Sequence, residues 1–498
     1  MEKYLNKFYE IIEKIGKQNF ILIVFILIIL IVTGLYQTFS LYTETEGLSV
    51  IDGINTYKFI LNSNNSTNSV TIAAGSSKNL DITVSNTSEI TLAYGIYYSS
   101  SSSLTNVALG YLSSTSALPT GTISAKSDNI VTMKINNFSA SNITINFGLK
   151  YGFENGGNLG LDTGQYWVEE YTITTAAQYV QNLYNDGSSI TNVNIANDST
   201  KPTVFLNYSQ EIMLDNNGDY RYYGKNPSNY VLYNDELWRI ISVGNVKSNI
   251  NDATGETRVK IVKADVLKDD NNLSAYSYDS SISTINSGSG VNDWSTSDLM
   301  SELNTLYYYS GSGVCYTGSS NATTACDFTN TGLSEEARNL TEDAVYYLGG
   351  GNTYYGYPNE HYINERGTNV YPSTTSDTCN DGSCPRATTW VGRIGIIYPS
   401  DYLYAADLIT CVSDGTYYSN SNCSSTNWLL YTGEIQRTIS QYAGNSSLTQ
   451  IISTNGNITI PSNSSDAYVI RPVQYLKSNV VITGGSGTSN VPYTLALA

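Results

Sequence analysis

The sequence has almost no histidine, since His361 is the only one in 498 residues. A Ser–His–Asp hydrolase and a His-rich metal site both need histidine at the reacting centre, so most members of either class are excluded. Positive charge is also scarce: 25 Lys and Arg residues stand against 43 Asp and Glu, for a net charge of −18. An acidic chain repels phosphate backbones, and we expect no nucleic-acid partner.

Charged residues make up only 14% of the chain and apolar residues 41%, which excludes a highly charged disordered protein. No P-loop or dinucleotide fingerprint is present, and no set of acid, base and nucleophile can be assembled. We therefore expect no enzyme, no catalytic residue and no cofactor. Tyrosine is abundant, with 43 residues against 10 Phe and 5 Trp, which favours exposed β-structure and long polar loops. At about 150 residues per domain, the length suggests two to three domains.

Residues 20–39 form a long apolar run. About 20 residues at 1.5 Å each cross a hydrocarbon core of about 30 Å, so the run is expected to be a transmembrane helix. Lysines precede the run and none follows until Lys58, which predicts a single pass through the cell membrane with extracellular C-terminal domains. Residues 1–19 are expected to be a cytoplasmic amphipathic segment. The run exceeds the roughly 7–15 apolar residues of a signal peptide, which favours a retained anchor, although cleavage near Val32-Thr33-Gly34 stays open.

Residues 45–170 alternate apolar and polar side chains, with turn-forming residues between the runs. Examples are Leu80-Ile82-Val84 and Val131-Met133-Ile135. Short half-buried strands with regular turns predict an antiparallel β-sandwich. The stretch resembles the immunoglobulin-like or TasA-like sandwiches that follow membrane anchors in Gram-positive surface and fibre proteins. After it, residues 171–200 are expected to be a helix, over Thr174 to Tyr184, and a linker.

Residues 201–498 contain the most distinctive motifs. Tyr230 to Tyr233, Leu237 to Val243 and Arg258 to Val262 predict a three-stranded meander with a turn at Asn234-Asp235. One helix is expected after Trp294-Ser295, and a second from an N-cap at Ser334 through Leu348 to Gly349-Gly350-Gly351. The predicted fold class is thus mainly β, with an α+β second domain.

The motifs WRII, DWSTSDLMSELN, RATTWVGRIGIIYPSDY, NWL and RPVQYLKSNV, in this order, resemble an uncharacterised extracellular domain of surface proteins from Gram-positive bacteria. That family in turn is similar to the C-type-lectin and formylglycine-generating-enzyme superfold. The resemblance implies a C-type-lectin-like domain and gives no activity. The calcium-binding triplets of lectins are missing, because the nearest string is Tyr357-Pro358-Asn359-Glu360.

Six cysteines lie in three sequence-local pairs, and no C-x-x-C motif is present, so disulfides are favoured over zinc. Six cysteines allow 15 pairings, but the cost of loop closure favours neighbours. We therefore predict three bridges: Cys315–Cys326, Cys379–Cys384 and Cys411–Cys423.

Three other features could carry chemistry. Asp215-Asn216-Asn217-Gly218-Asp219 resembles a calcium loop, but its glycine is fourth rather than sixth, which favours a turn; we expect no metal site. His361 is expected to be solvated or stacked rather than a general base. Glu365 and Arg366 are expected to form an ion pair.

Tryptophans and tyrosines are expected to differ in role. Trp238, Trp294, Trp390 and Trp428 stand in apolar motifs and are predicted core residues. The loop tyrosines are candidates for ligand binding, because aromatic faces stack on sugars or anchor protein partners, with packing as the open alternative. The candidate ligand-binding residues are Tyr402, Tyr404, Tyr417 and Tyr418.

Two hypotheses for function follow from these features. The first is a membrane-anchored bacterial surface protein whose C-terminal domain binds glycan or protein ligands for adhesion. The alternative is a structural subunit of an extracellular fibre or pilus-like assembly, whose partner is another copy of the chain.

Overall fold

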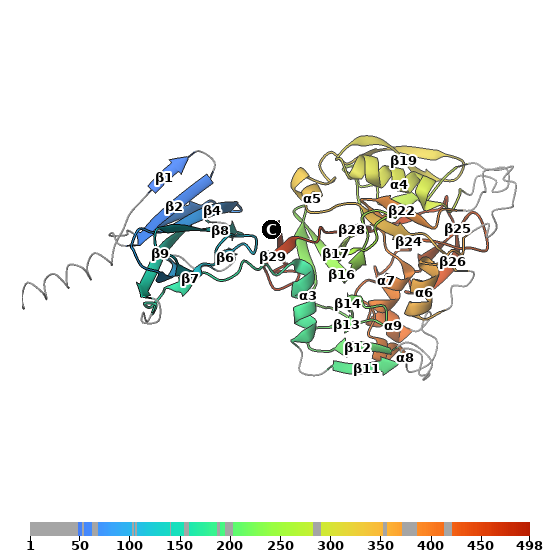
Figure 1. The fold of residues 1–498 in the computed structure, drawn as a ribbon. Helices are drawn as coiled ribbons and strands as arrows, with labels where there is room; N and C mark the ends of the chain where they lie inside the picture. The colour runs from blue at the N-terminus through green and yellow to red at the C-terminus, as the bar shows by residue number, and fades with distance from the viewer. Residues whose placement is uncertain are drawn as a thin grey trace, which may run out of the picture. The chain divides into compact units, whose positions relative to one another are not determined.

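The computed structural model describes residues 48–51, 54–61, 68–101, 104, 107–139, 141–153, 159–186, 190–194, 203–281, 290–351, 356–370, 386–412 and 421–498. The chain is mainly β and divides into two units, with the boundary between Ile173 and Thr174 (Figure 1). Within the described ranges, no helix is long and apolar enough to span a membrane. The predicted transmembrane helix, residues 20–39, and the segment 1–19 lie outside these ranges.

The first unit contains two five-stranded sheets around one core. The first sheet has the order β1 (Leu48–Ile51), β2 (Ile54–Leu61), β4 (Ser77–Asn86), β8 (Ser127–Asn137) and β6 (Val107–Tyr111). The second has β10 (Tyr166–Trp167), β5 (Leu92–Ser100), β9 (Ile143–Phe153) and β3 (Asn68–Ile72), with β7 (Thr120–Ile123) paired to β5.

The predicted alternation places the apolar residues of these strands in the core. Leu80, Ile82 and Val84 of β4 are fully buried, and so are Val131 and Met133 of β8. Side chains of successive residues in a strand point to opposite faces, so every second residue meets the other sheet. The expectation of a purely antiparallel sandwich is wrong in one place, because β2 pairs with β4 in parallel.

Several Asn-x-Ser strings in the chain close turns. Asn86 is 1% exposed and donates its amide to the carbonyls of Ile90, Ile123 and Ser124, while its Oδ1 accepts from the Ser88 N–H and hydroxyl. Asn137 and Ser139 repeat this arrangement at the end of β8. A buried asparagine satisfies backbone groups that would otherwise lack a partner, so these strings are structural.

The second unit is built on a nine-stranded sheet. Its order is β11 (Ile190–Asn194), β12 (Thr203–Asn207), β13 (Ile212–Leu214), β14 (Tyr220–Tyr222), β16 (Glu236–Val246), β17 (Glu256–Lys263), β28 (Pro472–Tyr475) and β23 (Gly395–Ile396), with β15 (Tyr230–Tyr233) paired to β16. The predicted meander is confirmed as β15, β16 and β17. Asn234 and Asp235 have φ of 58° and 56°, the left-handed geometry that a two-residue hairpin turn requires.

Smaller sheets and short helices complete the second unit (Figure 1). The second sheet is β18 (Ala275–Ser277), β27 (Ala467–Val469), β24 (Gln436–Gln441), β25 (Leu448–Ile452) and β26 (Ile458–Asn463). Three strand pairs are β19 (Ser312–Gly318) with β20 (Ala322–Asp327), β21 (Ala344–Tyr347) with β22 (Thr389–Gly392), and β29 (Val480–Gly484) with β30 (Thr494–Leu497). The helices are α3 (Ala176–Asn185), η1 (Trp294–Thr296), α4 (Asp298–Glu302), the π-helix η2 (Leu303–Tyr307), α5 (Glu335–Asn339), α6 (Pro358–Glu365), α7 (Pro399–Tyr404), α8 (Leu408–Val412) and α9 (Ser421–Ser425).

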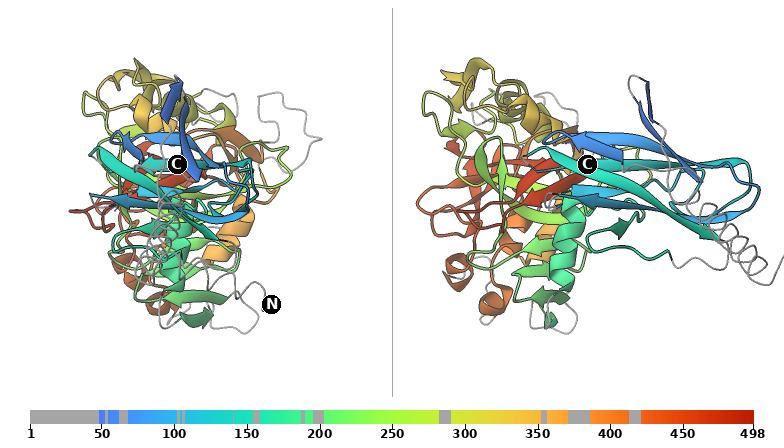
Figure 2. Two further views of the ribbon diagram at one scale, coloured as in Figure 1. Left: turned by 60° about the vertical axis from the view of Figure 1, so that its left-hand side comes forward. Right: turned by 90° about the vertical axis from the view of Figure 1, so that its left-hand side faces the viewer.

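Helix α3 forms where the sequence predicts it but is not part of a linker. Thr175 caps it, with a reciprocal bond from Gln178, and Val180 and Tyr184 are buried in the core of the second unit. The helix lies against the nine-stranded sheet (Figure 2). The expected linker over residues 171–200 therefore begins with an element of the second domain.

The predicted helix from Ser334 to Leu348 is too long. Ser334 is the N-cap and accepts from the Ala337 N–H, as expected, but α5 ends at Asn339. Ala344–Tyr347 is instead strand β21, paired with β22. The aromatic and β-branched residues of this segment favour a strand, and pairing with β22 decides the outcome.

Candidate functional site

A cluster of buried charges lies on the nine-stranded sheet and is built from three segments. The first is the turn between β13 and β14, which folds around Asp215. The Oδ1 of Asp215 accepts from the N–H groups of Asn217, at 2.8 Å, and Asp219, at 3.0 Å. Gly218 supplies a φ of 89°. The prediction that this string is a turn is confirmed.

Arg221, on β14, binds three carboxylates. Its Nε lies 2.7 Å from Asp215, its Nη2 2.8 Å from Asp219 and its Nη1 3.3 Å from Asp401. The guanidinium carries its donors in a fixed fork, so it fixes the position of all three acids at once. Because Asp401 is 180 residues further along the chain, Arg221 joins the hairpin to α7.

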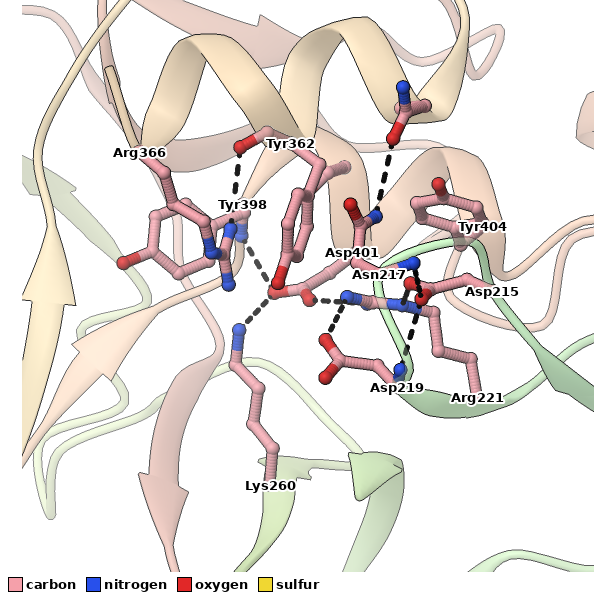
Figure 3. Close-up of polar contacts among 12 residues, drawn as sticks. Asp215, Asn217, Asp219, Arg221, Lys260, Tyr362, Arg366, Tyr398, Asp401 and Tyr404 are labelled. Carbon is pink, nitrogen blue, oxygen red and sulfur yellow. Dashed lines mark hydrogen bonds and ion pairs between the residues drawn. The ribbon is translucent and has the colours of Figure 1, made fainter. Parts of the chain in front are cut away.

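Asp401, in the first turn of α7, is the centre of the cluster. Lys260 of β17 and Arg221 approach its carboxylate from two sides, and the Tyr398 N–H donates to it at 3.1 Å (Figure 3). All three charged side chains are at most 4% exposed. Lys260 also lies 4.3 Å from the centre of the Tyr398 ring.

Burial and the neighbouring charges act in opposite directions on the pKa values of the cluster. Burial raises the pKa of Asp401, but Lys260 and Arg221 outweigh burial and hold the pKa below its ordinary value. Burial lowers the pKa of Lys260, and Asp401 opposes that effect. Burial also raises the pKa of Asp219, against the attraction of Arg221. A buried ion pair of this kind needs additional hydrogen bonds, and Asp401 accepts from Arg221 and the Tyr398 N–H as well as from Lys260.

A second pair of charges, Glu365 and Arg366, adjoins the cluster at the end of α6. Their side chains approach to 3.7 Å, so the predicted ion pair is confirmed. Glu365 accepts from both the N–H and the hydroxyl of Ser400, which joins α6 to α7. Burial raises the pKa of Glu365 to about 7, although Arg366 and Ser400 lower it. Arg366 packs on the Tyr362 ring at 3.4 Å, and 27% of its side chain remains exposed.

A small cavity lies beside these charges and is lined by both acidic and basic side chains. Its volume is about 30 Å³. The charged residues that line it are Asp219, Arg221, Lys247, Lys260, Arg366 and Asp401. The other lining residues are Ser242, Gly244, Asn245, Val246, Val345, Tyr347 and Tyr475. We call this cavity, with its lining, the polar pocket.

Gly244 leaves the space that the Asp219 carboxylate occupies in the pocket wall. A Cβ at Gly244 would lie 2.2 Å from the Oδ1 of Asp219. Because glycine has no Cβ, the Asp219 carboxylate can lie against β16 at this position while it binds Arg221. A larger residue would push the carboxylate out of the pocket wall or the hairpin away from the sheet.

Two of the predicted ligand-binding tyrosines, Tyr402 and Tyr404, belong to helix α7 and are buried. Tyr402 is 2% exposed and donates its hydroxyl to the Gly456 carbonyl; Tyr404 is 1% exposed and donates to Asn216. The ring of Tyr404 lies 4.7 Å from the Arg221 guanidinium. These two are packing residues, which corrects the expectation for them. Tyr417 and Tyr418 lie outside the described residues.

Among the described residues, the tryptophans and cysteines follow the predictions. Trp238, Trp294 and Trp428 are at most 5% exposed, and Trp390 is half-buried against the same core. Cys315 is bonded to Cys326, and Cys411 to Cys423. The predicted bridge between Cys379 and Cys384 falls outside the described residues. His361 is buried in α6 rather than solvated in a loop.

Sequence reasoning missed the residues at the centre of the cluster: Arg221, Lys260 and Asp401. The only available signal was charge inside an otherwise apolar strand, as with Arg258 and Lys260 in Arg-Val-Lys-Ile-Val at residues 258–262. Such a charge needs a buried partner, but nothing in the spacing says which one.

Among the described residues, no group of three or more acidic, His or Cys side chains is arranged to hold a metal ion. Comparisons with protein-family models, curated proteins and solved structures find no match for this chain.

Proposed function

We propose that this chain is a membrane-anchored bacterial surface protein whose second unit binds glycan or protein ligands, as an adhesion or recognition protein. The polar pocket carries the proposal. It is assembled from the β14 hairpin, the two central strands β16 and β17, and the helices α6 and α7. Segments far apart in the sequence thus bring charged side chains to one hollow, and converging polar groups of this kind fix the orientation of a ligand and provide specificity.

The sequence supports display on the cell surface. The apolar run at residues 20–39, with lysines only on its N-terminal side, supports a single-pass anchor. The local disulfides fit an oxidising compartment outside the cytoplasm.

The finer fold assignments belong to the same proposal. The two sheets of the first unit, which share one core and contain one parallel strand pair, support an immunoglobulin-like sandwich that acts as a stalk. For the second unit we propose a C-type-lectin-like domain, supported by the ordered motifs and by the combination of antiparallel strands, short helices and disulfide-bonded loops.

Binding of the full chain, purified in detergent, to arrays of glycans and extracellular proteins tests this function. We expect reproducible binding to a defined subset of ligands, and weaker binding by a variant in which the pocket wall is changed, Gly244→Leu. Matched melting curves show whether that variant stays folded. Concentration-dependent filaments with no binding to any array ligand would contradict the proposal and support the fibre subunit instead.

A further inference from the structure

Two cations that line the polar pocket make no hydrogen bond to a carboxylate. Among the described residues, no carboxylate lies within 4.0 Å of the Lys247 ammonium. Arg366 is ion-paired with Glu365 at 3.7 Å, beyond hydrogen-bond distance, and one of its N–H groups faces the Tyr362 carbonyl at 3.5 Å. In contrast, Arg221 and Lys260 both donate to aspartates. Lys247 and the remaining N–H groups of Arg366 are therefore the donors that a ligand could use.

The size of the polar pocket limits what these donors can meet. A cavity needs roughly 10–15 Å³ by this measure to hold one water, so about 30 Å³ accepts two atoms of water size. A carboxylate presents two oxygens of this size, and Lys247 and Arg366 both line the cavity that would receive them. The rest of any ligand must lie outside, against the half-buried Tyr347.

The backbone around the pocket offers few free groups to a peptide. Ser242 of β16 is paired with β14 on one side and with β17 on the other, whereas Gly244 is paired with β17 alone. On the β21 side, the Val345 and Tyr347 N–H groups already donate to the Lys247 carbonyl and the Tyr398 hydroxyl. Strand addition, the common way of binding an extended peptide, would find few N–H donors there. A sugar instead needs side-chain hydrogen-bonding groups and an aromatic residue, and Asp219, Asn245 and Tyr347 line the pocket.

We propose that the polar pocket binds the carboxylate of an acidic sugar, such as a uronic or sialic acid residue, between Lys247 and Arg366. This inference rests on the proposed function, since it names the ligand class for the same site. The hydroxyls of the sugar ring would donate to Asp219, and the ring would lie on Tyr347. Binding should weaken as salt is added, because the two cations are close to solvent.

Calorimetric titration of the full chain in detergent tests the inference with two pairs of probes. One pair is oligogalacturonate and its methyl ester, and the other is a sialylated oligosaccharide and its asialo form. We expect at least one acidic sugar to bind at least about tenfold more tightly than its neutral partner, since a bond to a charged group contributes this much. Lys247→Met should weaken that binding by a similar factor with an unchanged melting temperature. Arg366→Met should do the same, but it also loses packing on Tyr362, so Lys247→Met is decisive.

Lys268→Met is the matched control, because Lys268 is exposed and does not line the pocket. It should bind like the wild type. Equal binding of the acidic and neutral sugars, full affinity in Lys247→Met, or tighter binding of an acidic peptide would each overturn the inference. Selective binding of a neutral glycan or a protein would leave the proposed function standing, whereas failure of every array ligand would remove that function too.

Discussion

Replacing Asp401 with Asn removes the central charge of the cluster while it keeps the side chain's size. Lys260, which is 4% exposed, then has no buried counter-charge, and Arg221 keeps only two of its three carboxylates. Breaking a buried ion pair by removing one partner costs about 3–5 kcal/mol. Domains of this kind are stable by about 5–15 kcal/mol, so the change removes a large part of the total.

Unfolding of the full chain in urea, followed by tryptophan fluorescence, measures this effect. Four of the five tryptophans belong to the second unit, so the signal reports mainly on the unit that contains Asp401. Asp343→Asn is the matched control, because Asp343 is 46% exposed and pairs with the exposed Arg393; its cost should be below about 1 kcal/mol.

A double variant isolates the pair itself. Lys260→Met in the Asp401→Asn background removes the stranded cation, so the double variant should be more stable than the sum of the two single effects implies. A loss of less than about 1 kcal/mol in Asp401→Asn, equal to that of the exposed control, would show that the buried cluster does not hold the hairpin to α7.

Three further predictions concern Glu365, the Cys315–Cys326 bridge and the buried Trp238. Because burial raises the pKa of Glu365 from 4.5 to about 7, its contribution to stability is complete below pH 4.5 and is lost as the pH rises to about 7. The difference in unfolding free energy between the wild type and Glu365→Gln should change in that window and level off above it, in a pH series of urea titrations; a constant difference would contradict this. Replacing Cys315 and Cys326 with Ser should cost up to about 3 kcal/mol, since the bridge closes a short loop, and peptide mapping without reductant should find the bridge in the wild type. Trp238→Ala should cost about 3–5 kcal/mol because the ring is fully buried, whereas Tyr309→Ala, at a 65% exposed residue, should stay within about 0.5 kcal/mol; equal melting temperatures would refute the assigned burial.

The strands of the first unit could be predicted because a sheet with one buried face imposes a period of two on its sequence. Leu80, Ile82 and Val84 show that period and are all buried. The same pattern contains no information on strand direction, because a parallel strand buries the same alternate residues. The parallel pairing of β2 with β4 therefore could not be predicted from the sequence.

The region after Ser334 shows a different limit. The cap at Ser334 is a local signal and was predicted correctly. Ala344 and Leu348 are spaced as on a helix face, but the same residues are buried in and beside a strand, and only the distant partner β22 distinguishes the two. Short apolar segments are ambiguous in this way.

The candidate site was the least predictable part. Arg221, Lys260 and Asp401 meet through the fold alone, from positions separated by up to 180 residues. The sequence pointed instead to tyrosines, because aromatic clusters stand out in the composition. Tyr402 and Tyr404 are instead both buried, and the Tyr404 ring lies 4.7 Å from the Arg221 guanidinium of the charged cluster.

A crystal structure of the full chain with a ligand taken from the array shows directly whether the polar pocket is the binding site. We expect a polar group of the ligand, a carboxylate if the ligand is an acidic sugar, to lie in the polar pocket within hydrogen-bond distance of Lys247 and Arg366. A ligand bound elsewhere on the chain, with the pocket holding only water, would contradict this expectation.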